Sequence, residues 1–305
     1  MNSTSGDIRL FFKLAHGKLC GLMGTFVDDS LLGGDSQFLK TTDITLDKFE
    51  SKKREMHDFR FAGIYFKTLE DGIYLHQKSY IDRLTVLPLS CTYEMFRSTR
   101  AQLTWLIHTR PEICAAANMM AQVTEKIFEV KYVKLLNKTI NTLKETPSKG
   151  IKMRKLDLDS LYIKVYSDAS FANNPNLSSQ LGYIVLLCDK NDNCKILHYT
   201  SYKSRRVVRS VLGAEVYAMA DAFDYSYKLK HDLETILDKH IPLRIITYSK
   251  SLFDIITRNS SSIEKRLMID IKSVRHGYES MEISDIGFSK IHKQLRRCIH
   301  PNHHW

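Results

Sequence analysis

Short apolar runs separated by turn residues open the chain, a pattern typical of β-sheet. The runs 20–26 and 30–32 flank a pair of aspartates, which predicts a β-hairpin with carboxylates at its tip. Residues 38–49 follow with a helical period. The runs 59–66 and 73–76 then predict two strands joined by an Asp-Gly step, which is a strong hairpin signal. We therefore expect a sheet with one inserted helix.

The next stretch is predominantly helical. Residues 80–84 predict a short helix, and residues 86–92 contain a proline and no clear period, which indicates a boundary. Apolar residues then recur with helical spacing over 95–144, and Pro111 divides this region into two helices. Residues 146–155 carry a proline, a glycine and several lysines, so we expect the main linker of the chain there.

Strands and helices alternate in the remaining half. Three strands come first, followed by helix, strand, helix, strand and helix, and this order predicts a mixed α/β layout. The clearest candidates are the strands 161–167, 181–188, 195–199 and 243–247, the helix 214–237 and a helix that opens near Lys250.

Length and charge narrow the class of protein. The chain has 305 residues, enough for about two domains. Its apolar fraction of 43% and charged fraction of 26% exclude a disordered or fibrous chain. Lys and Arg number 45 against 34 Asp and Glu, which leaves a net charge of +11. We therefore expect an anionic partner, with nucleic acid the first candidate.

The sequence also suggests a compartment. No apolar run approaches the roughly 20 residues of a membrane helix, and the first residues lack a signal-peptide pattern. We expect an intracellular protein, cytoplasmic or nuclear, not secreted and with no membrane partner. The cysteines lack CxxC spacing, which favours free thiols over a disulfide framework. They are Cys20, Cys91, Cys114, Cys188, Cys194 and Cys298.

The acidic hairpin tip lies in a recognisable motif. Two adjacent carboxylates, Asp28 and Asp29, can hold a divalent metal, although an acidic pair in a turn is most often solvated surface. Their surroundings, LCGLMGTFVDDSLLGGD, resemble the palm motif of reverse transcriptases. Downstream, FAGIYFKTLEDGIYLHQKSYIDRL resembles that family's strands after the palm motif, and FRSTRAQLTWLIHTRPEI resembles its thumb and connection motif. The chain therefore resembles the Pol polyprotein of copia-type retrotransposons.

The second half resembles the ribonuclease H domain of the same polyprotein. YSDASFANN matches its first catalytic strand, with Asp168, and SVLGAEVYAMADA matches the helix that carries its catalytic glutamate, here Glu215. In ITYSKSLFDII the chain has Tyr248 where the family has a third acid. In GFSKIHKQLRRCIHP it has Arg297 where the family has a fourth.

The resemblance implies magnesium as the cofactor. Asp28 and Asp29 would hold it in the polymerase site, and Asp168 and Glu215 in the ribonuclease H site. Four acids would bring a charge of −4 to the second site, whereas the residues present bring −1, too little to hold two metal ions. Only 27 residues precede Asp28, so we expect the fingers and the third palm carboxylate to be missing.

The resemblance also implies an α/β fold class, in which an α+β palm fragment with a helical thumb and connection precedes a ribonuclease H-like mixed-sheet α/β domain. The expected domains are a partial palm over 1–90, thumb and connection helices over 91–150, and the ribonuclease H-like domain over 151–305. The parent family carries out RNA-directed DNA synthesis and cleavage of RNA/DNA hybrids, and we expect this fragment to be catalytically defective. The alternative is a non-catalytic, basic nucleic-acid-binding protein derived from the element. Oligomeric state stays open.

Basic residues precede the glutamate helix. Charged runs are usually solvated faces, but the net charge and the resemblance favour a groove that binds an RNA/DNA hybrid or another nucleic acid. The candidates are Lys203, Arg205, Arg206 and Arg209. Tyr202 beside them could stack on an unpaired base, although a tyrosine at a strand end is more often packed. The histidines of residues 292–304 match no zinc-ligand spacing, so we expect no zinc site.

Overall fold

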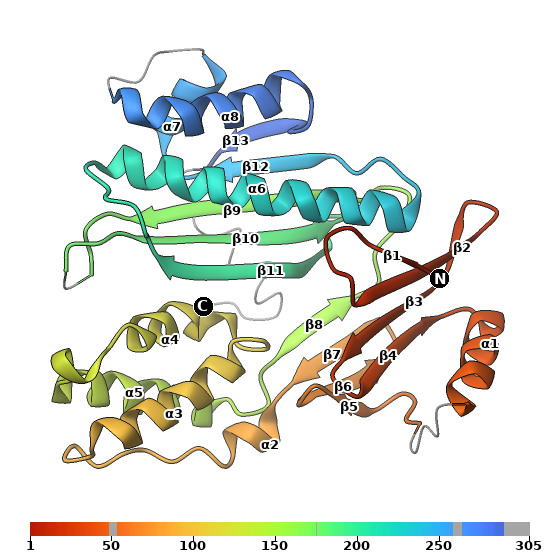
Figure 1. Ribbon diagram of the computed structural model, residues 1–305, viewed down its shortest axis with the longest axis horizontal. Coiled ribbons are helices and arrows are strands. Elements are labelled where there is room, and N and C mark those ends of the chain that lie inside the picture. The colour runs from red at the N-terminus through yellow and green to blue at the C-terminus, as the bar shows by residue number, and fades with distance from the viewer. Residues whose placement is uncertain (49–53, 175, 259–263, 290–305) are drawn as a thin grey trace.

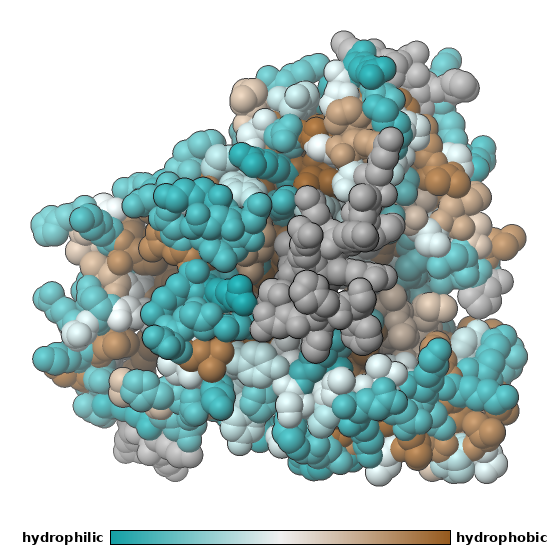
Figure 2. Space-filling model, turned by 180° about the vertical axis from the view of Figure 1, so that it is seen from behind, coloured by the Kyte–Doolittle hydropathy of each residue, from teal (hydrophilic) through white to brown (hydrophobic). Residues whose placement is uncertain are grey.

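A computed structural model describes residues 1–48, 54–174, 176–258 and 264–289. Figure 1 shows two small sheets beside a helical unit, with a larger sheet and its helices above both. Figure 2 shows that hydrophilic side chains cover most of one face of the molecule, with smaller hydrophobic areas between them. In the part of the chain that can be described, no helix is long and apolar enough to cross a membrane.

The first sheet is antiparallel and contains β1 (Asn2–Ser3), β2 (Leu10–Ala15), β3 (Lys18–Phe26) and β4 (Asp29–Gly34). Strands β3 and β4 form the predicted hairpin. Helix α1 (Ser36–Asp47) follows, and the carboxylate of Asp35 caps it by accepting the amide of Phe38 at 2.7 Å. The Phe38 ring is buried against Gly21 and Gly34, where a Cβ atom would lie 2.2 and 2.6 Å from the ring. This contact fixes the helix on the sheet.

The second sheet is also antiparallel and contains β5 (Phe59–Phe61), β6 (Ile64–Leu69), β7 (Gly72–His76) and β8 (Ile151–Arg154). The Asp-Gly hairpin between β6 and β7 is confirmed. The single strand predicted over 59–66 was wrong. Ala62 and Gly63 adopt φ of 46° and 77° and turn the chain back, so that β5 pairs with β6.

The linker predicted over 146–155 contains strand β8, which pairs with β7. A Cβ atom on Gly150 would lie 2.0 Å from the carbonyl oxygen of Leu75, so the chain can approach β7 this closely only without a side chain. The linker prediction was therefore wrong for residues 151–154. The division into three domains stays a prediction.

The helical unit contains α2 (Lys78–Ile81), α3 (Tyr93–Leu106), α4 (Cys114–Ala121) and α5 (Val130–Glu145), with short 3-10 turns η1 (Pro111–Ile113) and η2 (Glu125–Ile127). Its core is fully buried around Phe96, Leu103 and Leu136. The break at Pro111 is confirmed, but a second break after α4 makes three helices instead of two. Arg100 on α3 donates to the carbonyls of Met120 and Val123. It thereby supplies hydrogen bonds to carbonyl groups that have no partner within α4 at its C-terminal end.

The larger sheet has five strands in the order β11-β10-β9-β12-β13. The antiparallel strands are β9 (Tyr162–Ser170), β10 (Gln180–Cys188) and β11 (Cys194–Lys203), and β12 (Leu243–Thr247) and β13 (Asp285–Phe288) continue in parallel from β9. Helix α6 (Val211–Leu237) lies across one face, and α7 (Lys250–Thr257), the 3-10 turn η3 (Lys265–Leu267) and α8 (Met268–Glu279) pack beyond it (Figure 1). The predicted mixed α/β fold class is confirmed.

Two helices, α7 and α8, separate β12 from β13, where one helix was predicted. The final helix of the predicted order falls on residues 290–305, outside the described residues, and so do Arg297 and the histidine-rich tail.

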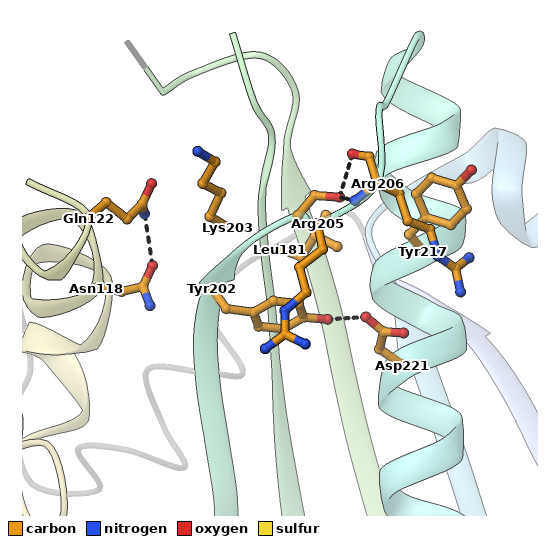
Figure 3. Close-up of a pocket in the computed structure, with 10 residues that line it drawn as sticks. Asn118, Gln122, Leu181, Tyr202, Lys203, Arg205, Arg206, Tyr217 and Asp221 are labelled. Atoms are coloured by element: carbon orange, nitrogen blue, oxygen red, sulfur yellow. Dashed lines mark hydrogen bonds between the residues drawn. The ribbon is translucent and has the colours of Figure 1, made fainter. Parts of the chain in front are cut away.

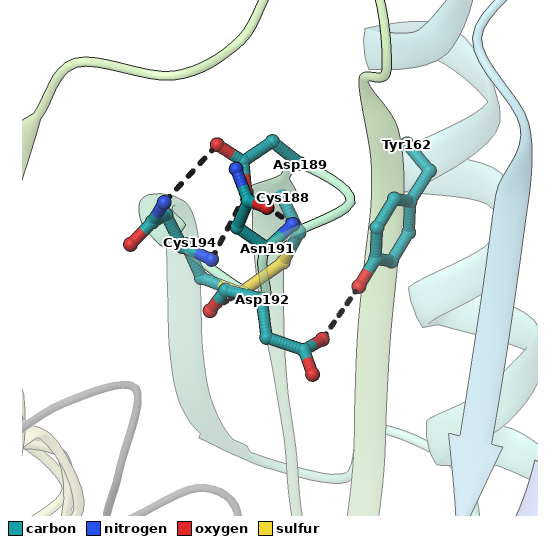
Figure 4. The surroundings of a disulfide bond; sticks show 7 residues. Tyr162, Cys188, Asp189, Asn191, Asp192 and Cys194 are labelled. Atoms are coloured by element: carbon teal, nitrogen blue, oxygen red, sulfur yellow. Dashed lines mark hydrogen bonds between the residues drawn. A yellow bond between two sulfur atoms is a disulfide. The ribbon is translucent and has the colours of Figure 1, made fainter.

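A disulfide closes the β10–β11 hairpin (Figure 4). Cys188 and Cys194 are direct cross-strand partners whose Cα atoms lie 4.2 Å apart, so the expectation of free thiols was wrong for this pair. The buried carboxylate of Asp189 orders the same turn by accepting the amides of Asn191 and Asn193 at 2.9 and 3.1 Å. Cys20, Cys91 and Cys114 are free.

The helical unit packs on the edge strand β11. The Tyr199 hydroxyl donates to the carbonyl of Ile107, and the Gln180 amide donates to Asn118 on α4 at 3.1 Å and to Ser201 at 2.9 Å. On the other side, the amide of Gly6 donates to Asp232 on α6 at 2.9 Å. These contacts fix both smaller units against the five-stranded sheet.

Candidate functional site

The predicted polymerase acids lie at the tip of the β3–β4 hairpin. Phe26 pairs with Asp29 across a two-residue loop of Val27 and Asp28, and both carboxylates are exposed. Val27 has a φ of 54° and is 82% exposed. A β-branched residue is rarely found in this left-handed region, because its side chain crowds the backbone.

Among the residues that the structure describes, no third metal-ligating side chain completes this pair. Over the described ranges, no group of three or more His, Cys, Asp or Glu residues is placed to hold a metal ion. Asp28 and Asp29 therefore form an exposed acidic turn on a strained hairpin loop.

The predicted ribonuclease H acids, by contrast, are brought together. Asp168 lies near the end of β9 and is exposed, while Glu215 lies just beyond the first turn of α6 and is 6% exposed. Ser210 caps this helix by accepting the amide of Gly213 at 3.0 Å and donating to Glu264 at 2.7 Å. The cap fixes the start of α6 and with it the place of Glu215.

The electrostatics of the pair are unusual. Burial and the nearby charge of Asp168 together raise the pKa of Glu215 to about 7, although a backbone hydrogen bond from Ala169 lowers it in part. The Oε2 atom of Glu215 is buried and makes no hydrogen bond to any described residue. Such an oxygen can accept a proton or coordinate a cation.

Tyr248, at the sequence position where the resembled family has a third acid, directly follows β12. The parallel register pairs Thr247 with Ser167, so the next residue, Tyr248, lies alongside Asp168. Its ring lies 6.3 Å from that of Tyr166 with an interplanar angle of 18°, and it packs with the apolar cluster on that side of the sheet. An aromatic side chain thus fills the space.

Two nearby acids do not replace the missing one. Asp254 on α7 forms ion pairs with Lys250 at 2.8 Å and Arg258 at 3.2 Å. Asp285 is the first residue of β13 and pairs with Arg244, near the start of β12. Tyr248 follows the opposite end of β12. Neither carboxylate is available to a metal beside Asp168.

The residues present fit one divalent ion better than two. Glu215 offers an oxygen without a hydrogen bond and Asp168 an exposed carboxylate, which together supply two hard oxygen ligands. A two-metal site needs further carboxylates to offset the repulsion between the ions, and Tyr248 contributes none at neutral pH. No metal cluster was found in the described residues.

The last residue of β11, Lys203, and the segment that follows it to Arg209 are called here the basic loop after β11. This loop lines a pocket of about 580 Å³ between α4 and α6 (Figure 3). Lys203 and Arg205 line the pocket beside Tyr202, and across the opening lie Asn118 on α4 and Gln122 directly after that helix. Arg205 and Arg209 are exposed. The structure therefore places Lys203, Arg205 and Arg206 of the predicted basic cluster at one pocket between the helical unit and the five-stranded sheet.

Arg206 differs from its neighbours. Its guanidinium donates to both carboxylate oxygens of Asp270 on α8 at 2.8 and 2.9 Å and lies 4.7 Å from the ring centre of Tyr217. A guanidinium engaged in this way is less able to bind phosphate. Tyr202 is packed, as the sequence favoured, because its hydroxyl donates to Asp221 on α6.

Sequence reasoning missed the α4 side of this pocket. Asn118 and Gln122 lie about eighty residues before the basic loop and hydrogen bond to each other at 3.0 Å. Nothing in their local pattern indicates a binding site, because only the packing of α4 on β11 brings them there.

Comparisons with known proteins agree with this architecture. No family model matches the sequence. The Retrovirus-related Pol polyprotein from transposon RE1 of Arabidopsis thaliana is 29% identical over 248 residues, which covers 72% of this chain and 16% of that polyprotein. The Transposon Ty1-ER2 Gag-Pol polyprotein of Saccharomyces cerevisiae is 31% identical over 111 residues, 36% of this chain and 6% of its own length.

A solved reverse transcriptase structure aligns with most of the chain. The foamy viral protease-reverse transcriptase in complex with an RNA/DNA hybrid aligns with 88% of this chain and 35% of that chain, at a TM-score of 0.50 and 13% identity. At this identity the likeness concerns the fold alone.

The homologues of this chain are retrovirus-related Pol polyproteins of transposons. The resemblance to a fragment of a copia-type Pol polyprotein is thereby confirmed, and the chain spans only a small part of the curated relatives that it matches.

Proposed function

We propose that this Pol fragment is catalytically defective at both of its acidic sites. The observation that carries the proposal is the aromatic packing of Tyr248 beside the Asp168–Glu215 pair. A half-buried tyrosine whose ring is stacked on Tyr166 and packed against an apolar cluster offers no carboxylate to a metal ion there.

Charge supports this proposal. Two divalent ions about 4 Å apart repel each other by about 16 kcal/mol at an effective dielectric constant of about 20. Asp168 and Glu215 offset at most two of the four positive charges, and burial already disfavours ionisation of Glu215. The pair therefore suits a single ion, whereas hydrolysis by the two-metal route needs both.

The polymerase-like hairpin is proposed to be inactive for a related reason. Its two exposed carboxylates lack a third ligand among the described residues. Without further groups to position a nucleotide, the pair cannot arrange an in-line attack. Primer extension that Asp28→Asn abolished would contradict this half of the proposal.

The decisive experiment is degradation of a labelled RNA/DNA hybrid with magnesium or manganese. We expect no cleavage above the level of Asp168→Asn, a variant that removes the exposed acid. Cleavage by the parent chain that disappears in Asp168→Asn would overturn the proposal, because contamination by another nuclease would persist in the variant.

The alternative function, non-catalytic binding of nucleic acid, is favoured by the basic opening at the pocket. Lys203 and Arg205 line the pocket, and Arg209 is exposed beyond it, where its charge helps to lower the pKa of Glu264. Within 1–48, 54–174, 176–258 and 264–289, none of these three cations forms a salt bridge. Three phosphate contacts predict a log-log salt slope of about −2.7 on duplex. Arg206 adds no phosphate contact to this slope, because its guanidinium is paired with Asp270.

Fluorescence anisotropy with a labelled hybrid at several salt concentrations tests this alternative. Arg205→Ala should flatten the slope by about 0.9, since one phosphate contact is lost. Lys272→Ala, an exposed lysine on α8, is the matched control and should leave the slope unchanged. Equal slopes for both variants would show that the basic loop is only a solvated surface.

A further inference from the structure

The four-stranded β5–β8 sheet has two faces of opposite chemistry. Side chains alternate along each strand, so residues that are register partners share a face. On one face Phe59, Phe61 and Phe66 pack together, with ring centres 5.0 Å apart for Phe59 and Phe66 and 6.2 Å for Phe61 and Phe66. The residues of this face are otherwise apolar except for Thr68. Apolar packing on this face therefore stabilises the sheet.

The opposite face carries aromatic and basic residues in two rows. Arg60 pairs with Tyr65, which pairs with His76 on β7. In the second row, Lys67 pairs with Tyr74, which pairs with Lys152 on β8. An aromatic residue lies next to a cation in each row. We call this set, Arg60, Tyr65, His76, Lys67, Tyr74 and Lys152, the aromatic–basic face.

The rings of this face are held in place. Tyr65 and His76 lie 5.4 Å apart with an interplanar angle of 3°, and Tyr74 lies 5.8 Å from His76. The Tyr74 hydroxyl donates to the carbonyl of Ser148 at 2.6 Å. Tyr65 remains 40% exposed. A fixed ring with an open side can receive a second flat ring without losing much conformational freedom.

The cations make the face positive. Arg60 and Lys67 are exposed, and neither forms an ion pair with another described residue. Lys152 is neutralised by Asp71 at 2.8 Å. Burial lowers the pKa of His76, and Lys67 and Lys78 lower it further, so the imidazole is neutral at pH 7 while the surrounding potential is positive.

We propose that the aromatic–basic face binds single-stranded nucleic acid, with bases stacked on Tyr65 and His76 and phosphates held by Arg60 and Lys67. The inference rests on the proposed nucleic-acid partner but assigns it to a different surface from the basic loop after β11. A duplex hides the flat faces of its bases, whereas an unpaired strand offers both bases and phosphates. The spacing of cations beside rings fits the unpaired strand.

Binding of a short labelled oligothymidylate, followed by fluorescence anisotropy at low salt, tests the proposal. Stacking of one base predicts that Tyr65→Leu weakens binding by about 5- to 100-fold, while Tyr65→Phe, which keeps the ring, stays within about twofold. Tyr227→Leu is the matched control, because Tyr227 is 42% exposed on α6. Lys67→Ala should flatten the salt slope by about 0.7.

Equal affinities for Tyr65→Leu and Tyr227→Leu, with both variants folded by circular dichroism, would overturn the proposal. The same holds if Tyr65→Phe weakens binding as much as Tyr65→Leu. Failure of this inference and failure of the proposed hybrid binding are distinguishable. Hybrid binding sensitive to Arg205→Ala but no oligothymidylate binding refutes only the face, whereas the reverse pattern refutes only the basic loop.

Discussion

Removing the buried acid Glu215 should stabilise the protein at alkaline pH. The carboxyl has a pKa of about 7 in the folded chain, against about 4.5 for an ordinary glutamate. Between these values the native state holds a proton that the unfolded state has released. The free energy of unfolding therefore falls as pH rises through this window and is constant above it.

The magnitude follows from the difference between the two pKa values. About 2.5 units at 1.36 kcal/mol per unit give an upper limit of about 3.4 kcal/mol. Solvent near the exposed Asp168 carboxylate screens part of the interaction, so we expect about 2 kcal/mol. Glu215→Gln keeps the shape and cannot ionise, so it should be more stable than the parent by this amount at about pH 8 and equal to it at about pH 4.

Urea unfolding of both proteins across this pH range measures the effect. Asp168→Asn provides a graded control, because it removes only the charge contribution and should give a shallower pH dependence. Glu279→Gln, an exposed glutamate on α8, should leave the curve unchanged. A parent protein whose stability rises between about pH 5 and 7, or a Glu215→Gln variant that follows it, would refute the reasoning.

Three further predictions concern other parts of the chain. Arg110→Met should lower the free energy of unfolding, measured in urea, by about 3 kcal/mol. The reason is that the buried guanidinium donates to Glu112 at 2.8 Å and to the carbonyl and hydroxyl of Thr146 at 2.9 and 2.8 Å. A loss under about 1 kcal/mol would contradict this prediction. The double variant C188S/C194S should lose less than about 2 kcal/mol, since the closed loop is short and already hydrogen bonded, and it should match the reduced parent in urea. Tyr248→Asp together with R297D should recover more hybrid cleavage than either change alone, because acids that share metal ions act as a unit, and additive or absent recovery would argue against that.

Local sequence patterns predicted those elements whose signals are short-range. The aspartate pair between two apolar runs gave the β3–β4 hairpin, and the Asp-Gly step gave the β6–β7 hairpin. Pro111 marked a boundary between helices, because a residue without a backbone donor is tolerated at the first position of a helical turn, and Pro111 opens η1. The motifs around Asp168 and Glu215 identified two acids that the fold does bring together.

Tertiary structure decided everything that depends on distant partners. Strand β8 exists because Gly150 lets the chain approach Leu75, and Arg206 is occupied because α8 presents Asp270 to it. Sequence alone named Tyr248 as a substitution, but only the parallel pairing of β12 with β9 showed that its ring fills the space beside the acids. Long-range pairing sets these contacts, and no local period encodes which distant segment will be the neighbour.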